Sequence, residues 1–349
     1  MNLNRTVFIV DDNDTSMALA EEALGQHYRI MTVPSAKKMF SLLEWIIPDL
    51  ILLDIEMPEM DGFEALEKLS SIAEYENIVV IFLTDQADPD SEARGLELGA
   101  ADFITKPFTK HVLLRRIQMR LDINSLVIER TNHLLRLKNG VVSVLAEIVE
   151  SRDKTTGGHI ERTTAYIKVL MEEMMAHGIY ADEMRSWDFQ TTISSARLHD
   201  IGKIAIPDSI LNKPGPLSPE EFEVIKTHAK EGENIISRIV DLSGEVDFLY
   251  SAKMFAGYHH ERWDGEGYPH GLKGEGIPLQ GRIMAIVDVY DALVSDRPYK
   301  KAFTQERAER IIMEGSGREF DPTIMEAFLR VKKHFKEIKI VLMDSQMLL

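Results

Sequence analysis

The sequence contains no cysteine, which excludes disulfide bonds and thiolate metal ligands. Any transition metal must therefore be held by histidine, aspartate or glutamate. The lack of cysteine also fits a reducing compartment. No apolar segment follows a basic start, and none is long enough to span a bilayer, so we expect a cytoplasmic protein that does not contact membranes.

Positive charge is also scarce. The chain has 40 Lys and Arg against 57 Asp and Glu, for a formal net charge of -17, and its basic residues form no evident patch. Such a field repels polyanions, and no recognition-helix module is visible, so direct DNA binding is disfavoured. A small phosphorylated ligand remains compatible with this balance, since a metal cluster can reverse the sign of the local field.

A chain of 349 residues predicts two domains, and 44% hydrophobic with 28% charged residues is typical of globular proteins. Up to about Leu121, short β-branched runs alternate with helical stretches, which indicates βαβ units and a doubly wound parallel sheet. The runs are Thr6–Val10, Asp49–Leu53, Ile78–Leu83 and Asp102–Ile104.

From Lys110 to about Arg152 the pattern is helical, and after Gly140 the strand signal largely disappears. Helical segments there alternate with Gly- and Pro-rich loops, so the second domain is predicted to be all-α. We place the first domain at residues 1–122, a helical linker at 123–140 and the second domain at 141–349.

Acidic residues follow several of the predicted strands. In a parallel α/β sheet, functional groups gather beyond the carboxyl ends of strands, where Asp11, Asp12, Asp54, Thr84 and Lys106 fall. Three converging carboxylates would repel one another without a divalent cation, and oxygen ligands suit Mg²⁺. Asp54 could attack a phosphoryl group while Lys106 neutralises charge and Thr84 binds the new phosphate. A single aspartate of this kind could equally be a helix cap.

This stretch resembles the response-regulator receiver family, over about a third of the chain. The matching residues are Asp11-Asp12, Leu53–Gly62, Thr84 and Phe103–Pro107. The resemblance implies a five-stranded sheet, phosphorylation of Asp54 by a cognate histidine kinase, Mg²⁺ ligation by the Glu56 backbone carbonyl, and Phe103 as the aromatic switch residue, a position where Tyr is also common.

The 11 histidines fall into two groups. Most of them, His27, His111, His133, His177, His270 and His334, have no evident partner and are interpreted as surface or packing residues. The others lie at helix ends or on apolar helix faces together with two aspartates: His159, His199, Asp200, His228, His259, His260 and Asp288. A lone histidine is more often structural, but this set in a chain without cysteine indicates a metal cluster, which would also remove the cost of burying Asp288.

These residues give the second domain a specific resemblance to the HD-GYP family of the HD phosphohydrolase superfamily. The matching segments are Thr156–His159, His199–Lys203, Leu211–Leu217, His228, His259–Pro269 and Asp288–Lys300. The resemblance implies a cyclic di-GMP phosphodiesterase. One iron or manganese ion would bind His159, His199, Asp200 and Asp288, and a second His228, His259 and His260, with Asp200 bridging. Some members hold a third metal through a glutamate where this chain has Thr155, so we predict two metals.

Two bridged cations would make hydroxide from water and clamp the phosphodiester for attack. Lys203 is placed to act on the phosphate or the leaving alkoxide. The resemblance adds substrate contacts for Arg297 and Lys300, whose alternative is a solvated basic patch. Tyr268, in the turn Gly265–Pro269, could touch the ligand; that turn could also shape the fold or bind a signalling partner.

The helix from Lys110 to Arg152 could carry a signal from Asp54 to the cluster, serve as a passive spacer, or form a homodimer, since leucine and valine recur along Leu121–Leu145. Two other functions stay open: a nucleotide phosphohydrolase of the wider HD superfamily, and an adaptor that binds cyclic di-GMP without turnover. The residue types do not determine which metal binds, whether the product is pGpG or GMP, or whether cyclic GMP-AMP is also a substrate.

Overall fold

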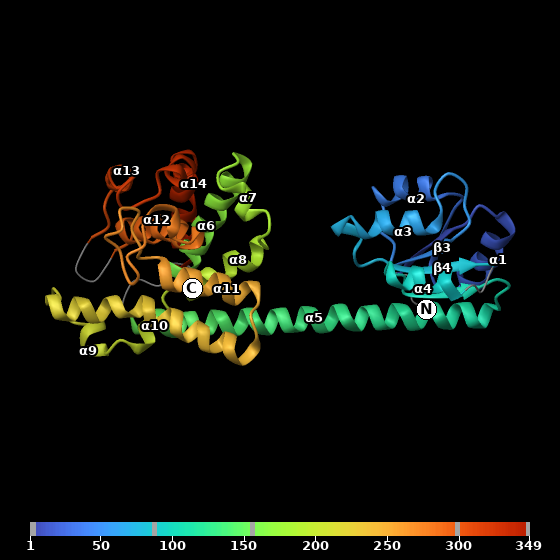
Figure 1. The fold of residues 1–349 in the computed structure, drawn as a ribbon, viewed down its shortest axis with the longest axis horizontal. Coiled ribbons are helices and arrows are strands. Elements are labelled where there is room, and N and C mark those ends of the chain that lie inside the picture. Colours follow the sequence, from blue (N-terminus) through green and yellow to red (C-terminus); the bar gives the residue numbers. More distant parts are fainter. Residues whose placement is uncertain (1–4, 86–88, 154–157, 297–300, 347–349) are drawn as a thin grey trace. The chain divides into compact units, whose positions relative to one another are not determined.

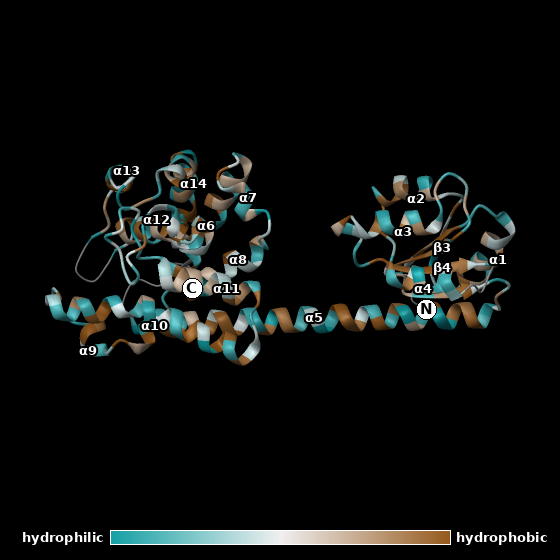
Figure 2. Cartoon of the chain, viewed as in Figure 1, coloured by the Kyte–Doolittle hydropathy of each residue, from teal (hydrophilic) through white to brown (hydrophobic). Residues whose placement is uncertain are grey.

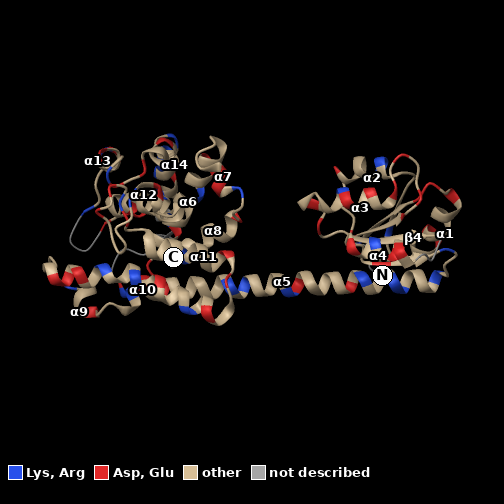
Figure 3. Cartoon of the chain, in the orientation of Figure 1, with Lys and Arg blue, Asp and Glu red and all other residues tan. Residues whose placement is uncertain are grey.

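The structure is a computed structural model that describes residues 5–85, 89–153, 158–296 and 301–346. The chain divides into two compact units, residues 1–135 and 136–349, and each is considered separately. Lysine and arginine are interspersed with aspartate and glutamate over both units (Figure 3). Among the described helices, none has the length and apolar character needed to cross a membrane.

Unit 1 is a doubly wound α/β domain, as predicted. Its five parallel strands lie in the order β2-β1-β3-β4-β5 (Figure 1). They are β1 (Thr6–Val10), β2 (Arg29–Val33), β3 (Leu50–Asp54), β4 (Val79–Thr84) and β5 (Asp102–Thr105). β2 was not found among the apolar runs of the sequence because it is an edge strand in which only Val33 is buried. β3 is buried at all five positions, which explains its uninterrupted apolar run.

The two faces of the sheet bury separate cores. Alternate residues of β1 point to opposite faces, so that Phe8 packs with α2 and α3, and Ile9 packs with α1 and α5. The helices of this unit are α1 (Asp14–Leu24), α2 (Ala36–Leu43), α3 (Gly62–Ser70) and α4 (Pro89–Glu97), with a 3₁₀ turn at Ala73–Tyr75. The strand order changes direction between β1 and β3, which is where sheets of this type bind ligands.

α5 (Lys110–Arg152) confirms the long helix predicted from the sequence, including the segment 123–140. Its N-terminal part contributes Leu113 and Ile117 to the core of unit 1. Its C-terminal part lies in unit 2, where Val142 and Val149 pack against Leu198, Ile236 and Phe248.

The regular secondary structure in the described part of unit 2 is helical apart from one isolated bridge between Ser316 and Phe320, as predicted. Its helices are α6 (His159–Ala176), α7 (Ala181–Met184), α8 (Phe189–Ser195), α9 (Asp208–Leu211), α10 (Pro219–Ser243), α11 (Asp247–Tyr258), α12 (Leu279–Val294), α13 (Gln305–Glu314) and α14 (Pro322–Gln346), with 3₁₀ turns η2 (Ala196–Leu198), η3 (Ile201–Ala205) and η4 (Gly274–Gly276).

An aromatic cluster joins α6, α12 and α14 at the centre of unit 2. Tyr166 stacks on Phe335 with ring centroids 4.5 Å apart, and Tyr290 meets Tyr166 edge-on at 5.3 Å. Each of these rings is fully buried. Such packing fixes α12 against α6 and so sets the separation between the polar residues that both helices carry.

Candidate metal centres

The strand ends of unit 1 bring three carboxylates together. Asp11 follows β1, Asp54 ends β3, and the parallel register pairs Val10 with Leu53 just before them. Oxygens of Asp11, Asp12 and Asp54 lie within 4.8 Å of one another, with Asp11 and Asp54 buried and Asp12 exposed. Oxygen ligands clustered with one side open to solvent fit Mg²⁺, which keeps several waters when bound to proteins.

Lys106 follows β5 and reaches back into this pocket. Its Nζ donates to Asp11 Oδ2 at 2.8 Å and to Asp54 Oδ1 at 2.9 Å. Burial raises the pKa of Asp54 to about 6, although the Lys106 ammonium opposes this shift. Burial alone would lower the pKa of Lys106, but its hydrogen bonds to the two aspartates hold it above its usual value. The lysine is therefore a fixed cation beside the predicted phosphoacceptor.

The remaining receiver residues surround that pocket at different depths. Thr84 ends β4 half-buried, and its carbonyl accepts from the Lys106 amide at 2.8 Å. Phe103 is buried against Phe82, with ring centroids 5.1 Å apart, and leaves no room for a side chain at Gly95 of α4. Glu56 has an exposed side chain, two residues beyond Asp54. The predicted switch ring therefore couples β5 to α4 through packing.

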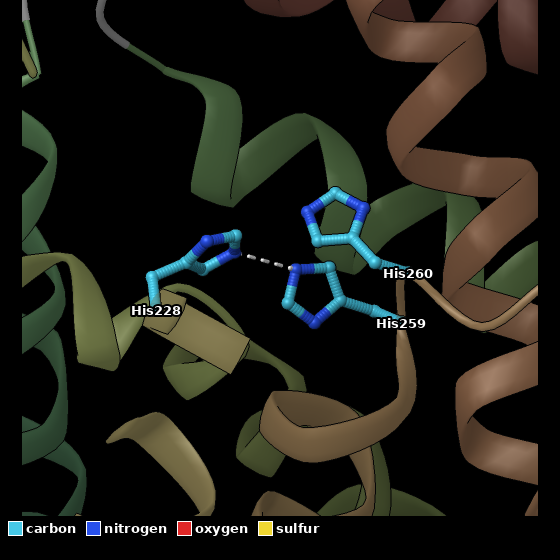
Figure 4. Close-up of side chains that lie close together, drawn as sticks. All are labelled: His228, His259 and His260. Atoms are coloured by element: carbon cyan, nitrogen blue, oxygen red, sulfur yellow. Dashed lines mark hydrogen bonds between the residues drawn. The ribbon is translucent and has the colours of Figure 1, made fainter. Parts of the chain in front are cut away.

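The histidines and aspartates predicted to bind metal come from separate elements of unit 2. His159 begins α6, Asp288 lies on α12, and His228 lies within α10. The adjacent pairs follow helix ends: His199-Asp200 after η2, and His259-His260 after α11. The structure brings six of them into two groups, and within each group the ligand atoms lie within 4.8 Å of one another. The first group is His159, His199 and Asp200, and the second, drawn in Figure 4, is His228, His259 and His260.

One carboxylate faces both groups. Asp200 Oδ2 lies 3.3 Å from His199 Nε2, whereas its Oδ1 lies 3.5 Å from His228 Nε2. The same Oδ1 is 3.8 Å from His259 Nε2. Asp288 Oδ1 lies 3.6 Å from His159 Nε2 and completes the first group. This is the arrangement required of a carboxylate that bridges two cations.

The orientation of the imidazoles fits metal ligation. Nδ1 of His199 donates to the carbonyl of Ala196 at 2.9 Å, and Nδ1 of His228 donates to that of Ile225 at 2.7 Å. These bonds leave Nε2 as the unprotonated nitrogen, which faces the cluster. His228 Nε2 and His259 Nε2 lie 3.3 Å apart, a repulsive contact for two lone pairs that a cation would relieve. Burial lowers the pKa of His228 and His260, and that of His259 to about 3. These rings are therefore neutral and can each offer a nitrogen lone pair to a metal.

Asp291 is a functional residue that the sequence analysis missed. Its carboxylate is buried and accepts from His159 Nδ1 at 2.8 Å and from Arg162 Nε at 2.7 Å and Nη2 at 2.9 Å. Burial would raise the pKa of Asp291, but the bonds from His159 and Arg162 lower it, so it remains ionised. It fixes the tautomer and rotation of His159, as carboxylates commonly do behind metal-bound histidines. Its position three residues after Asp288 placed it on the same helix face.

Lys203 contacts the same oxygen of Asp200 that faces His199. Its Nζ lies 2.8 Å from Asp200 Oδ2 and donates to Asp153 Oδ2 at 2.6 Å. Burial opposes the charge of Lys203, but the two aspartates raise its pKa above the usual value, so the group is an ammonium ion. Asp153, directly after α5, is a second residue that sequence reasoning missed.

The turn predicted to carry Tyr268 is built around His260. The Tyr268 ring stacks on the His260 ring at 4.7 Å, and its amide donates to the His260 carbonyl at 3.2 Å. Gly267 has no space for a side chain, since a Cβ would lie 2.3 Å from the Arg262 amide nitrogen. Buried Glu261 accepts from the amides of His270 and Leu272, at 2.7 and 2.8 Å. The turn therefore supports His260 directly.

Two histidines interpreted as unpartnered have partners. His270 Nε2 lies 3.0 Å from Glu233 Oε2 and its ring stacks on Tyr258, while His177 Nδ1 lies 3.0 Å from Glu173 Oε1. Glu233 comes from α10, far from His270 in the chain, so spacing alone could not indicate this pair. Arg297, Lys300 and Thr155 lie outside the described residues.

A pocket opens over the cluster. Its lining includes Lys203, Tyr268 and every predicted metal ligand except His259, together with Glu150, Ile160, Arg197, Phe222 and Ile225. Cationic, carboxylate and apolar surfaces thus meet at one cavity, which suits a phosphorylated ligand with ring systems.

Comparison with known proteins agrees with this geometry. Residues 7–118 match the response regulator receiver domain, and residues 143–324 match the HD domain. The chain is thus a response regulator with an HD output domain, a domain type that implies divalent metal binding. It belongs to the family of receiver–HD proteins whose curated members are named cyclic di-GMP phosphodiesterases, which confirms the family expected from the motifs.

Three relatives show the extent of the likeness. A probable cyclic di-GMP phosphodiesterase of Vibrio cholerae serotype O1 is 40% identical over 98% of this chain and 81% of its own length. The cyclic di-GMP phosphodiesterase response regulator RpfG of Xanthomonas campestris pv. campestris is 33% identical over 97% of this chain and 90% of its own. A 3′3′-cGAMP-specific phosphodiesterase 2 of the same Vibrio is 38% identical over 57% of this chain and 36% of its own.

Proposed function

We propose that this chain hydrolyses cyclic di-GMP at the His/Asp cluster of unit 2, to pGpG, GMP or both, and that phosphorylation of Asp54 controls the rate. The observation that carries the proposal is the placement of Asp200 between two groups of imidazoles. The names of the full-length relatives supply the substrate. Iron or manganese in the cluster and Mg²⁺ at Asp11, Asp12 and Asp54 are part of the proposal.

Two divalent cations bound here would lower the pKa of water and neutralise charge on the phosphodiester. The chain's own residues do the rest. Asp200 and the histidines would hold the cations, and Asp291 keeps His159 in the tautomer that could ligate one of them. One water adds to phosphorus, the P–O3′ bond breaks, and the departing oxygen takes up a proton, which the proton released by the attacking water replaces on the donor. The Lys203 ammonium, held by Asp153 and Asp200, is the nearby donor and also stabilises negative charge on the phosphate.

Substrate contacts are proposed for Tyr268, Arg297 and Lys300. Tyr268 lines the pocket beside His260, and Lys226 lies over its ring at 5.7 Å from the centroid. A purine could stack in such a setting, and the two basic residues would bind phosphate. Signalling proteins could also bind at the Gly265–Pro269 turn.

Control by Asp54 is proposed to act through α5. The helix begins in unit 1. Its last turn contacts the segment of unit 2 at residues 201–208, which carries Lys203 and is called the lysine loop below. Arg152 donates to the carbonyls of Ile204 at 2.8 Å and Ile206 at 3.1 Å, and Glu150 Oε1 accepts from the His159 amide at 2.9 Å. A shift of this helix end would therefore move both Lys203 and a metal ligand. The phosphodonor is proposed to be a cognate histidine kinase.

The test uses the full chain reconstituted with iron or with manganese. Cyclic di-GMP, 3′3′-cGAMP and a panel of nucleoside phosphates are incubated with it, with and without acetyl phosphate and Mg²⁺, and the products are separated by chromatography. Turnover of cyclic di-GMP that changes with acetyl phosphate in the wild type, and not in Asp54→Ala, supports the proposal. Equal responses of the two proteins to acetyl phosphate would contradict control of the rate by phosphorylation of Asp54.

The other candidate functions have distinct outcomes in the same test. Hydrolysis of nucleoside phosphates without hydrolysis of cyclic dinucleotides would indicate a general HD phosphohydrolase. Saturable binding of cyclic di-GMP by metal-loaded protein without any product would indicate an adaptor. Either result would overturn the proposed reaction.

A further inference from the structure

The pocket over the His/Asp cluster has an aromatic wall on α10 that the proposed reaction does not use. Phe222 and Ile225 line the pocket together with His228, and the three follow one another at steps of three residues, so each neighbours the next on the helix surface. Hydrophilic and hydrophobic residues alternate along this helix (Figure 2). Phe222 is 47% exposed although its ring is apolar. Such a ring gains further burial when a ligand covers it.

The position of Phe222 fits the base of a nucleotide whose phosphate lies at the His/Asp cluster. Six residues separate Phe222 from His228, which is about 9 Å along the helix axis. The ribose of a nucleotide holds its base several ångströms away from the phosphate. A phosphate bound next to His228 can therefore bring its base to Phe222 rather than to the metal ligands.

A second ring, that of Tyr268, lies near the same space. The Lys226 Nζ lies 5.2 Å from the ring centroid of Phe222 and 5.7 Å from that of Tyr268, so one ammonium group lies over both rings. His260 stacks on one face of Tyr268, which leaves the other face for a ligand. Two aromatic rings that share one neighbour in this way form a slot in which a purine can stack.

Lys226 brings a hydrogen-bond donor to this slot. Guanine presents two acceptors, O6 and N7, along one edge, whereas adenine presents N7 beside the N6 donor. An ammonium group at that edge therefore favours guanine. Lys226 also pairs with Glu223 at 2.6 Å, but the Glu223 side chain is 69% exposed, and an exposed ion pair of this kind contributes little that would hold the lysine in place.

We propose that Phe222 and Tyr268 hold a guanine base of the substrate between them, and that Lys226 selects guanine over adenine. The inference rests on the proposed function, because it takes from it a nucleotide whose phosphate binds at the His/Asp cluster. Phe222 contacts the base and not the reacting atoms. Its loss should therefore weaken binding of the base and leave binding of the phosphate intact.

The first test measures binding by calorimetry on the full chain loaded with manganese. The ligands are GMP and ribose 5-phosphate, which has the sugar and phosphate without the base. The wild type should bind GMP more tightly than ribose 5-phosphate. Phe222→Ala should weaken the affinity for GMP about 10- to 100-fold and leave that for ribose 5-phosphate unchanged, whereas Phe222→Trp should keep both affinities.

Tyr250→Ala is the matched control for this test. Tyr250 is also 47% exposed on a helix of unit 2, and it lies outside the pocket lining that the described residues form. Its loss should leave the affinity for GMP unchanged. Equal affinities of the wild type for GMP and ribose 5-phosphate, or an unchanged affinity for GMP in Phe222→Ala, would overturn the proposal.

Lys226→Met tests the choice of base. The wild type should bind GMP about tenfold more tightly than AMP, and the variant should bind the two nucleotides alike. Lys226→Arg should keep the preference, since a guanidinium group also donates to O6 and N7. A preference for GMP that persists in Lys226→Met would contradict the role of this lysine.

Hydrolysis of cyclic di-GMP by the same proteins separates this inference from the proposed reaction. A wild type that binds GMP through Phe222 but does not hydrolyse cyclic di-GMP would overturn the reaction and support the base site. A wild type that hydrolyses cyclic di-GMP with the same kcat/KM as Phe222→Ala would support the reaction and overturn the base site.

Discussion

Each unit holds a lysine between two carboxylates, but the two sites differ in what surrounds that trio. Lys106 lies 2.8 Å from Asp11 and 2.9 Å from Asp54, and Lys203 lies 2.6 Å from Asp153 and 2.8 Å from Asp200. Among the described residues, the metal-ligand group at the first lysine consists of carboxylates, whereas the groups at the second include five imidazoles.

This difference sets the chemistry that each site can support. Oxygen donors suit a labile Mg²⁺ that leaves a carboxylate free to receive a phosphoryl group. Neutral imidazoles suit transition metals, and a carboxylate shared between two histidine groups is committed to holding them rather than to attack. Under the proposed function, similar lysine–carboxylate geometry would serve a reversible modification in one unit and hydrolysis in the other.

The largest effect is expected from Asp200→Asn. The change removes the charge that faces both histidine groups, and with it several kcal/mol of metal-dependent transition-state stabilisation. At about 1.4 kcal/mol per tenfold, turnover of cyclic di-GMP should fall on the order of 10³-fold. Elemental analysis should show lost metal, while Asp54 should still take up phosphate from acetyl phosphate. Asp182→Asn, at an exposed site, is the control. Full activity in Asp200→Asn would place the chemistry elsewhere.

Opposite responses to acid are expected of the two units in the presence of a chelator. Burial raises the pKa of Asp54 to about 6, so its protonated form favours the fold: this stability is present below about pH 4 and is lost as the pH rises through about 6. The effect is at most about 3 kcal/mol, from a shift of about 2 units. Burial lowers the pKa of His259 to about 3, so unit 2 loses stability as the pH falls below about 6.5.

Hydrogen exchange of amides in each unit, followed from pH 4 to pH 7, measures these responses separately after correction for the intrinsic exchange rate. Asp54→Asn should remove the response of the strands in unit 1 and leave that of unit 2. Parallel responses of both units would contradict the assigned difference between the sites. Adding Mg²⁺ should reverse the sign in unit 1, because the cation favours the ionised carboxylate.

A smaller effect is expected from Asp291→Asn, since this residue holds a ligand and does not ligate. Losing the bond to His159 Nδ1 should weaken metal affinity by about 10- to 100-fold. Competition with a chelator measures the change, and activity should recover at high metal concentration. Asp296→Asn, at a site exposed beyond the end of α12, should bind metal like the wild type. An unchanged metal affinity in Asp291→Asn would contradict a role for Asp291 in orienting His159.

Much of unit 1 could be predicted from the sequence because its determinants are local. A buried strand such as β3 is a run of apolar residues, and its functional residue follows directly. β2 was not predicted because an edge strand with one buried residue lacks such an apolar run. The family resemblance supplied the fifth strand, not the periodicity.

The site of unit 2 was predictable only for residues that stand out by type. Histidines on apolar faces in a chain without cysteine indicate metal by themselves. Asp291 and Asp153 are ordinary aspartates, and their roles come from partners 132 and 50 residues away in the sequence. Such pairings depend on how α12, α5 and the lysine loop pack, which no local pattern encodes.

The smallest effect is expected from Asp153→Asn. This variant tests whether Lys203, like Lys106, depends on both of its carboxylate partners. Asp200 would still hold Lys203, so the ammonium should remain but lose the partner that aims it. A hydrogen bond to a charged group contributes about 1.5 to 3 kcal/mol, and since one of two partners remains, we expect kcat to fall about 10-fold.

The KM of this variant separates positioning from a general structural role. If Asp153 only aims Lys203 at the departing oxygen, KM and metal content should stay near the wild-type values, and Asp153→Glu should recover part of kcat because it restores the charge. A matched change in kcat for Asp208→Asn, an exposed partner of Arg152 in the same loop, would mean instead that the whole end of α5 had loosened. In that case the lysine of unit 2 would be fixed by its loop, and the likeness to Lys106, which two carboxylates hold directly, would be confined to distance.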